Sequence, residues 1–297
     1  MKVFVTGATG FVGTAVVKEL IDAGHQVTGL ARSEASANAL IAAGAQVHRG
    51  DLEDIESLRT GASNSDGVIH AGFVHDFTRF KVVCEIDRIA IGAMGSVLAG
   101  SNRPFVVTSG TALVRPGVMA TEAMASHHDP ENFPRMSEAA ALALKDKGVR
   151  VSMLRLAPSV HGDGDRHGFI PMMINLAREK GISAYIHDGA NRWSAVHRLD
   201  AAKLYRLALE QGETGAYYHA VGDEAITVKV IAEKIAGKLN IPSRSVTSSD
   251  APGHFNWFAN FAALDCPASS AITQNRLNWR PTHPSLLEDL SGNVYFK

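Results

Sequence analysis

The sequence lacks the features that mark secreted, membrane-spanning and nucleic-acid-binding chains. Its 297 residues include only two cysteines, Cys84 and Cys266, which are too few for a disulfide framework and are expected to be small core residues in a reducing compartment. No stretch approaches the roughly 20 apolar residues that span a bilayer, and the first residues lack the apolar run of a signal peptide. The net charge of −1 sets up no field that would attract nucleic acid or an anionic membrane. These absences predict a cytoplasmic protein whose partner is a small molecule.

The first half of the chain alternates short apolar segments with amphipathic helical patterns. Helix boundaries are marked by Gly24 after the first pattern and by Ser33, a candidate N-cap, before the second. Such alternation is typical of a parallel sheet covered by helices on both faces. We therefore predict an α/β fold, with a doubly wound parallel sheet over residues 1–156. Residues 157–297 are predicted to form mainly a smaller C-terminal substrate lobe, with some segments returning to the core. The predicted core strands lie at 2–5, 25–32, 45–52, 67–72, 103–110 and 149–156.

The segment TGATGFVG, residues 6–13, follows the first predicted strand and opens the first helix. It places Gly7, Gly10 and Gly13 three residues apart. In a dinucleotide-binding turn, the first glycine makes the tight turn, the second lets the backbone approach a pyrophosphate, and the third lets the helix pack closely on the strand. The free N–H groups at the start of the helix then face the phosphates. This context predicts a Rossmann-like dinucleotide site.

The residues after the second and third strands bear on which dinucleotide binds. An acidic side chain after the second strand would favour the free ribose hydroxyl of NAD, but this chain has Arg32 and Ser33, which suit the 2′-phosphate of NADP. The alternative is a solvated arginine beside a helix-capping serine. Asp51, after the third strand, is expected to accept from the adenine amino group, to cap the next helix, or both. We predict NADP(H) in preference to NAD(H).

Six segments together resemble the extended and atypical short-chain dehydrogenase/reductases, a group that includes NAD-dependent epimerases and dehydratases. They are TGATGFVG, GDL at 50–52, HAG at 70–72, VVTSG at 106–110, RLAPSVHG at 155–162 and AVHRLDAAKLYRLALE at 195–210. The resemblance covers nearly the whole chain and implies a nicotinamide cofactor, a C-terminal substrate lobe and a later helix capped by Asp200. The cofactor residues expected from the spacing and the resemblance are Gly7, Thr9, Gly10, Phe11, Val12 and Gly13 at the pyrophosphate, Arg32 and Ser33 at the ribose, Asp51 and Leu52 at the adenine, Ala71, Gly72 and Phe73 beneath the cofactor, Thr108 after the fifth strand, and Pro158, Ser159 and Val160 near the nicotinamide.

The chemistry of that family usually depends on a tyrosine and a lysine in the pattern YxxxK, which this chain lacks. The lysine lowers the tyrosine pKa so that the phenol can pass a proton near neutral pH. No tyrosine precedes Tyr185, and alignment on Glu138 places the pattern at Pro130 and Pro134. Neither proline can transfer a proton, so the usual proton donor is missing.

The resemblance implies that some atypical members of the family use HxxxR in place of YxxxK. Arg135 stands at about the position of the arginine, but Glu131 stands where the histidine would be. The literal HxxxR of this chain runs from His75 to Arg79, in the loop after the fourth strand. The replacement for the proton donor is therefore open on sequence grounds.

Four side chains are candidates for catalysis: the hydroxyls of Ser109 and Thr111, the guanidinium of Arg135 and the imidazole of His161. Arginine can polarise a carbonyl oxygen but holds its proton too tightly to donate it, whereas histidine titrates near the working pH. Each candidate has a structural alternative. The hydroxyls can satisfy strand-end backbone groups, Arg135 can form an ion pair with Glu138, and His161 can be a hydrogen-bonded loop residue.

The segment HGDGDRH, residues 161–167, holds two histidines and two aspartates. Structural zinc sites usually contain cysteine or tighter histidine spacing, so we predict a polar lid over the substrate and no metal. His75, His167 and Trp193 are expected to contact the substrate, although Trp193 is equally suited to the core.

The combined features predict an NADP-dependent oxidoreductase of the short-chain type. It would transfer hydride to or from a small carbonyl or alcohol substrate through a non-standard active site, as a monomer or a homodimer. The alternatives are a non-catalytic NADP(H) sensor and a cofactor-recycling epimerase or isomerase, because function resides in the site and not in the fold.

Overall fold

The computed structural model of the chain describes residues 1–126 and 134–296. Within these residues, one parallel sheet has its strands in the order β10-β6-β5-β4-β1-β2-β3. The direction of winding reverses between β1 and β4, and in open α/β sheets such a switch point is where ligands bind, outside the carboxyl ends of the strands. The strands of this sheet are β1 (Lys2–Thr6), β2 (Gln26–Ala31), β3 (Gln46–Arg49), β4 (Gly67–His70), β5 (Pro104–Gly110), β6 (Arg150–Leu156) and β10 (Tyr217–Ala220).

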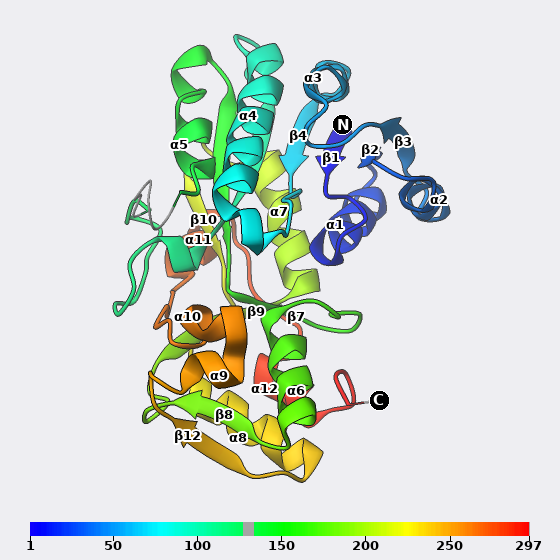
Figure 1. Ribbon diagram of the computed structural model, residues 1–297. Helices are drawn as coiled ribbons and strands as arrows, with labels where there is room; N and C mark the ends of the chain where they lie inside the picture. The colour runs from blue at the N-terminus through cyan, green and yellow to red at the C-terminus, as the bar shows by residue number, and fades with distance from the viewer. Residues whose placement is uncertain (127–133, 297) are drawn as a thin grey trace.

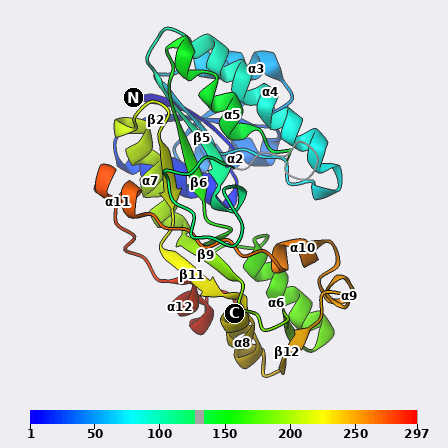
Figure 2. The same cartoon turned by 90° about the vertical axis from the view of Figure 1, so that its left-hand side faces the viewer.

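Helices cover both faces of this sheet, as Figures 1 and 2 show. One face carries α1 (Phe11–Asp22), α2 (Glu34–Ala42) and α7 (Arg198–Gln211), and the other carries α3 (Ile55–Ser63), α4 (Phe80–Leu98) and α5 (Ser137–Leu142). Successive strand side chains point to opposite faces, so Val3 and Val5 pack with the first set of helices and Phe4 with the second. The prediction of a doubly wound α/β sheet is confirmed.

Local signals placed several boundaries correctly. Ser33 caps α2 by accepting a hydrogen bond from the N–H of Ser36. Gly24 takes a left-handed conformation (φ +84°) just after α1. The helical pattern between the strands predicted at 67–72 and 103–110 becomes α4, preceded by a 3-10 turn, η1 (Phe77–Arg79). These features depend only on neighbouring residues, which is why the sequence predicts them.

Two expected helix caps were wrong. The helix after Asp51 is α3, and its N-cap is Asp54, which accepts from the N–H of Ser57. The N-cap of α7 is His197, and Asp200 lies within the first turn of the helix. Asp200 instead accepts from the backbone N–H groups of residues 282 and 283, so it holds a distant segment of chain.

The C-terminal part forms a lobe at the carboxyl end of the main sheet, in the lower half of Figure 1. Its core gathers large apolar side chains, among them Trp193, Phe258 and Leu286. The chain does not stay in this lobe, because β10 pairs with β6 and α7 packs on α1. The lobe contains two small sheets, β11-β9-β7 and β12-β8, built from β7 (Ser159–His161), β8 (Ser183–Ile186), β9 (Arg192–His197), β11 (Asp223–Thr227) and β12 (Ser243–Val246).

The remaining elements are short apart from two helices of the lobe, α6 (Phe169–Lys180) and α8 (Val228–Leu239). No helix in the described ranges combines the length and apolar character needed to cross a membrane. The short helices are η2 (Thr111–Leu113), η3 (Lys145–Lys147), α9 (Ala251–Phe255), η4 (Asn256–Phe258), α10 (Ala259–Ala262), α11 (Ala271–Arg276) and α12 (Leu286–Ser291).

Candidate functional site

The glycine turn between β1 and α1 is closed tightly against the end of β4. A Cβ on Gly7, whose φ is +66°, would lie 2.6 Å from the backbone N of Gly72 and 2.7 Å from the carbonyl of Ala71. A Cβ on Gly13 would lie 1.9 Å from the carbonyl oxygen of Gly7. These contacts are far shorter than side chains tolerate, so the turn requires glycine at both positions.

The start of α1 is open to an anion. Its N-cap is Gly10, which has no side chain to accept from the N–H groups of the first turn. Helix N-termini with free N–H groups bind phosphates. The guanidinium of Arg198, from the start of α7, lies 5.0 Å from the ring centre of Phe11 and adds a cation beside this turn. Arg198 was not among the predicted site residues, because nothing in its local pattern connects it with a turn 187 residues away.

The predicted ribose and adenine residues lie at the carboxyl ends of β2 and β3. Arg32 is exposed, and the Ser33 hydroxyl is used to cap α2. Asp51 is exposed, and its Oδ1 accepts from the N–H groups of Glu53 and Asp54, which fixes the turn before α3. Leu52 packs beside Gly72, at the end of β4. The glycine turn therefore lies at the same edge of the sheet as Arg32 and Asp51.

Thr108, near the end of β5, is held in a partly buried hydrogen-bond chain. Its hydroxyl donates to the carbonyl oxygen of His70 (2.6 Å) and so accepts from the hydroxyl of Tyr205, also at 2.6 Å. Tyr205 is fully buried, and burial raises the pKa of its phenol well above the usual range. A phenol held in this way serves as a clamp between α7 and β5 and is a poor proton donor.

Arg135 lies at the same carboxyl edge, between the ends of β4 and β5. Its guanidinium carbon is 4.4 Å from the ring centre of Phe73, and its Nη2 donates to the carbonyl oxygen of Thr108 over a long 3.4 Å. Its Nε donates to the Ser137 hydroxyl at 2.9 Å. The side chain is therefore held by a contact within its own segment and by contacts with the segments at the ends of β4 and β5. The other positions of the YxxxK and HxxxR alignments, Pro130 and Glu131, lie outside the described residues.

His75 stands close to Arg135. Its ring makes an edge contact with Phe73, 5.7 Å between ring centres, and the residue is exposed to solvent. Partial desolvation, and then the charge of Arg135, lower the pKa of His75. Arg79 does not share this site, because its side chain turns to Asp76. The literal HxxxR thus contributes its histidine and not its arginine.

Glu138 pairs with Arg155 and not with Arg135, so the structural alternative for Arg135 is wrong. Glu138 binds Arg155 of β6 through two parallel hydrogen bonds of 2.7 and 2.8 Å, both buried. Burial alone would raise the pKa of Glu138, but the Arg155 guanidinium outweighs it and the pKa is lowered. Arg155 also donates to Nε2 of His219, which completes a buried charged cluster beneath the site.

The remaining catalytic candidates are buried. Ser109 and Thr111 are each 2% exposed, and the Thr111 hydroxyl lies 3.3 Å from that of Ser194 in β9. His161 is fully buried, with its Nδ1 2.6 Å from Asp289 of α12. Burial favours a structural role for all three. The neighbouring Pro158, Ser159 and Val160 form the crossing from β6 into β7, at the start of the lobe.

The two other predicted substrate residues separate. Trp193 is 1% exposed and donates its indole N–H to the carbonyl oxygen of Leu264, so it belongs to the lobe core. His167 is exposed at the rim of a shallow pocket of about 270 Å³ at the start of α6. In the predicted lid, the Asp165 carboxylate is already hydrogen-bonded within the protein, because it accepts from Tyr295 and from the N–H of Gly168.

A group of metal-ligand types does occur, at the start of α7. His197, Asp200 and His283 have one potential ligand atom each within 4.8 Å of one another. All three side chains already have hydrogen-bond partners, since His197 accepts from the N–H of Leu199, and Asp200 accepts from the backbone and Nδ1 of His283. The group therefore fixes the 282–283 segment on α7.

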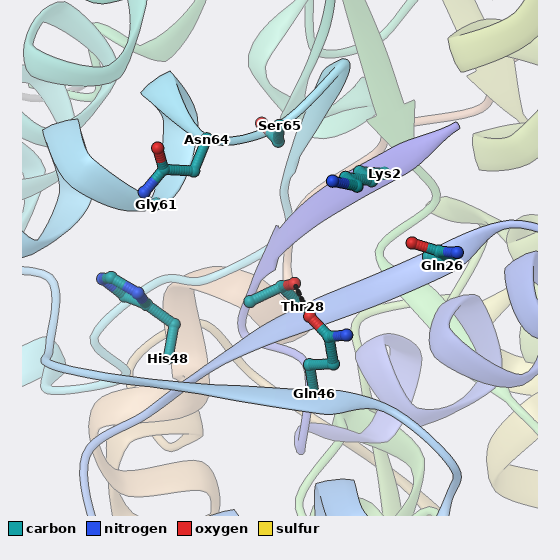
Figure 3. A pocket seen from close by; sticks show the side chains of 8 residues that line it. All are labelled: Lys2, Gln26, Thr28, Gln46, His48, Gly61, Asn64 and Ser65. Atoms are coloured by element: carbon teal, nitrogen blue, oxygen red, sulfur yellow. Dashed lines mark hydrogen bonds between the residues drawn. The ribbon is translucent and has the colours of Figure 1, made fainter.

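Figure 3 shows a polar pocket of about 370 Å³ at the other end of the sheet. Lys2 and Gln26, the first residues of β1 and β2, line it, whereas the glycine turn follows the last residue of β1. It lies on the side where parallel strands begin and is separate from the candidate site. The full lining is Lys2, Gln26, Thr28, Gln46, His48, Gly61, Asn64 and Ser65.

Comparisons with known proteins agree with this geometry. Residues 3–81 match the family described as the NAD dependent epimerase/dehydratase family. An uncharacterised protein of Schizosaccharomyces pombe is 48% identical over 298 residues, covering 100% of both chains. A 4-hydroxy-2-methyl-3-oxo-4-farnesyl-3,4-dihydroquinoline-1-oxide ketoreductase of Stigmatella aurantiaca is 25% identical, covering 90% of this chain and 84% of that one.

Solved structures show the same fold. The dTDP-glucose 4,6-dehydratase of Streptomyces venezuelae, solved with NAD bound, has a TM-score of 0.77 at 20% identity and covers 98% of this chain and 95% of that one. The glycine turn, the doubly wound sheet and these matches together establish that the chain belongs to the NAD-dependent epimerase/dehydratase family of extended short-chain dehydrogenase/reductases.

Proposed function

We propose that the protein is an NADP(H)-dependent reductase of a small carbonyl compound, in which Arg135 and His75 replace the missing tyrosine and lysine. The observation that carries this proposal is the position of Arg135, fixed at the carboxyl ends of β4 and β5 beside Phe73 and Thr108. The ketoreductase from Stigmatella supports the reaction class. The exposed Arg32 at the ribose end supports NADP(H).

The residues present suit a dinucleotide. Gly7 and Gly13 hold a tight turn that a Cβ at either position would disrupt, and the open N-terminus of α1 and the Arg198 guanidinium offer donors to a pyrophosphate. The bound nicotinamide would supply the hydride. The task left to the protein is to hold the carbonyl and to stabilise the negative charge that develops on its oxygen.

Arg135 can perform that task as a permanently charged hydrogen-bond donor. His75 can then deliver a proton to the alkoxide from its protonated form. Because the pKa of His75 is lowered, its protonated form is the stronger acid but is populated only at lower pH. The rate of reduction is therefore expected to fall as pH rises through this lowered pKa.

The test is NADPH oxidation, followed by absorbance, with a panel of small aldehydes and ketones. Arg135→Ala is expected to lower kcat/KM about 10²-fold, the scale for loss of an oxyanion donor, while the Kd for NADPH changes little. Arg79→Ala, which removes a nearby exposed arginine bound to Asp76, is the matched control. Equal rates for Arg135→Ala and wild type would overturn the proposal.

A second function is favoured by one observation, the burial of Ser109, Thr111 and His161. If none of these groups reaches a substrate and His75 is not an acid, the protein would be an NADP(H) sensor. Tight NADPH binding without consumption across the whole panel would select that alternative.

A further inference from the structure

Asp87 of α4 is a buried carboxylate behind the candidate catalytic edge. It is 1% exposed, its Oδ1 lies 3.1 Å from Nε2 of His70, and its Oδ2 accepts from the Ser137 hydroxyl at 2.5 Å. Ser137 in turn accepts from Nε of Arg135. On the other side, Nδ1 of His70 lies 2.7 Å from the hydroxyl of Thr6. We call Thr6, His70, Asp87, Ser137 and Arg135 the Asp87 network.

The direction of each hydrogen bond in the His70 arm follows from its first donor. The N–H of Gly72 donates to the Thr6 oxygen, so the Thr6 hydroxyl can direct its own proton to Nδ1 of His70. With Nδ1 accepting, the nitrogen of His70 that donates is Nε2, which points to Asp87. This arm runs from the peptide that packs on Gly7 to the buried carboxylate.

The Ser137 arm runs from the same carboxylate to the catalytic candidate. Ser137 has one proton to give and gives it to Asp87, which leaves its oxygen free to accept from Arg135. Burial raises the pKa of Asp87, but His70, the Arg135 charge and Ser137 together outweigh burial and the pKa is lowered. Asp87 is thus a buried anion on which both arms converge, and buried charges persist where they are paired in this way.

We propose that Asp87 is a positioning residue that holds Arg135 in a fixed geometry through Ser137. Asp87 is also linked to the glycine turn, through His70 and Thr6, so Arg135 keeps a fixed position relative to that turn. The proposal rests on the proposed function, because it takes Arg135 to be the group that contacts the carbonyl. It adds that the orientation of Arg135 is set from α4, by a side chain that touches neither substrate nor cofactor. Side chains held by such supporting bonds keep the geometry that catalysis requires.

A double-mutant cycle tests this coupling. Asp87→Asn is expected to lower kcat about 10²-fold with a smaller effect on KM, since displacement of a catalytic group by about 1 Å has that cost. In the Arg135→Ala background, the same substitution is expected to change kcat less than about 3-fold, because the group it positions is gone. Full additivity of the two effects would overturn the inference while leaving the proposed function intact.

The control for the loss of a buried carboxylate is Glu122→Gln. Glu122 is 5% exposed and accepts from the backbone N–H and hydroxyl of Thr273. Any effect of this substitution on kcat is expected to be the same in the wild-type and Arg135→Ala backgrounds. If Glu122→Gln behaves like Asp87→Asn in the cycle, the coupling reflects general loosening of the fold and the inference fails.

Ser137 provides a second measurement that does not disturb the Asp87–His70 contact. Ser137→Ala removes the hydroxyl that donates to Asp87 and accepts from Arg135, and it is expected to lower kcat with the Kd for NADPH unchanged. Ser137→Thr keeps a hydroxyl and is expected to restore most of the rate. This pair decides the question if Asp87→Asn yields no folded protein. Equal rates for the alanine and threonine variants would contradict the inference, whereas an inactive panel for the wild type would contradict the proposed function instead.

Discussion

At the edge where the strands end, the two halves of the central sheet differ in the groups that they carry. The half formed by β1, β2 and β3 offers backbone: a glycine turn, an open helix terminus and exposed side chains such as Arg32 and Asp51. The half formed by β4, β5, β6 and β10 offers buried charge. Asp87, Glu138 and Arg155 are all less than 5% exposed there.

This difference has a physical reason. A dinucleotide phosphate is bound well by N–H groups that a short turn can supply by itself. A catalytic cation has to be aimed, and a long arginine side chain keeps one orientation only when other groups hold it. The second half of the sheet therefore carries ionised groups inside, which are stable only as long as each keeps its partners. Four substitutions test the contrast, from the largest expected effect to the smallest.

In the first half of the sheet, the addition of a single methyl group should disrupt the glycine turn. Gly13→Ala would place a Cβ 1.9 Å from the Gly7 carbonyl, so the turn must open. We expect loss of measurable NADPH binding by fluorescence titration and a loss of roughly 4 kcal/mol in the free energy of unfolding by urea. Gly237→Ala in α8, where nothing lies within 4 Å of the added methyl, should instead stabilise by up to about 1 kcal/mol and leave binding unchanged. Equal behaviour of the two variants would contradict the tight turn.

In the second half of the sheet, the removal of one buried charge should destabilise the folded protein. Glu138→Gln leaves the buried Arg155 without its anion and is expected to lower the free energy of unfolding by about 3 kcal/mol, measured by urea denaturation. Glu56→Gln, in an exposed pair with Arg59, should change it by less than about 1 kcal/mol. A small effect at Glu138 would mean that the interior of this half is more hydrated than its burial indicates.

The second half should also be the acid-sensitive one. Burial lowers the pKa of His219 from 6.5 to about 4, with Arg155 adding to the shift against the opposite influence of Glu122. Between these values the unfolded chain binds a proton that the folded protein does not, so stability is lost as pH falls from about 6.5 towards 4, by at most about 3 kcal/mol from this group.

The measurement is urea denaturation at pH 7 and pH 5. In His219→Asn the amide can replace the donor to the Ser269 carbonyl oxygen, but no imidazole remains to titrate. We expect the variant to be less stable at pH 7 and to lose less stability between the two pH values than the wild type. An unchanged loss would assign the acid sensitivity to other groups.

The mildest change concerns the choice of cofactor in the first half. If Arg32 binds a 2′-phosphate, Arg32→Ala should weaken NADPH binding about 10-fold, the scale of one exposed charge-assisted hydrogen bond, and leave NADH almost unchanged. Arg49→Ala, a neighbouring arginine bound to Glu34, should affect neither. Equal losses for NADPH and NADH on Arg32→Ala would return Arg32 to a solvated surface role.

Sequence reasoning reached the first half far better than the second. The glycine spacing, the Ser33 cap and the core strands were all readable because each depends on residues close together in the chain. The Asp87 network was missed, although a signal existed. Asp87 lies on the apolar stripe of α4 with Val83, Ala90 and Met94, where a carboxylate has to be paired.

The errors have a common cause. Asp200 was expected to cap its own helix, and the structural alternative for Arg135 was an ion pair with Glu138, which is close to it in the chain. Asp200 instead binds the backbone at residues 282 and 283, and Glu138 pairs with Arg155 of β6. Trp193 is the same case, since only its contact with residues near 264 decides between pocket and core.

The sequence by itself determined the class of fold, the glycine turn and the absence of the usual tyrosine and lysine, because strand periodicity, backbone conformation and motif composition are local properties. Only the tertiary structure decided which charges are buried, which hydroxyls a substrate could reach, and that Arg135 is aimed through Ser137 from Asp87. Hydrogen bonds between segments 50 residues apart depend on how helices pack over the sheet, and no local pattern specifies that packing.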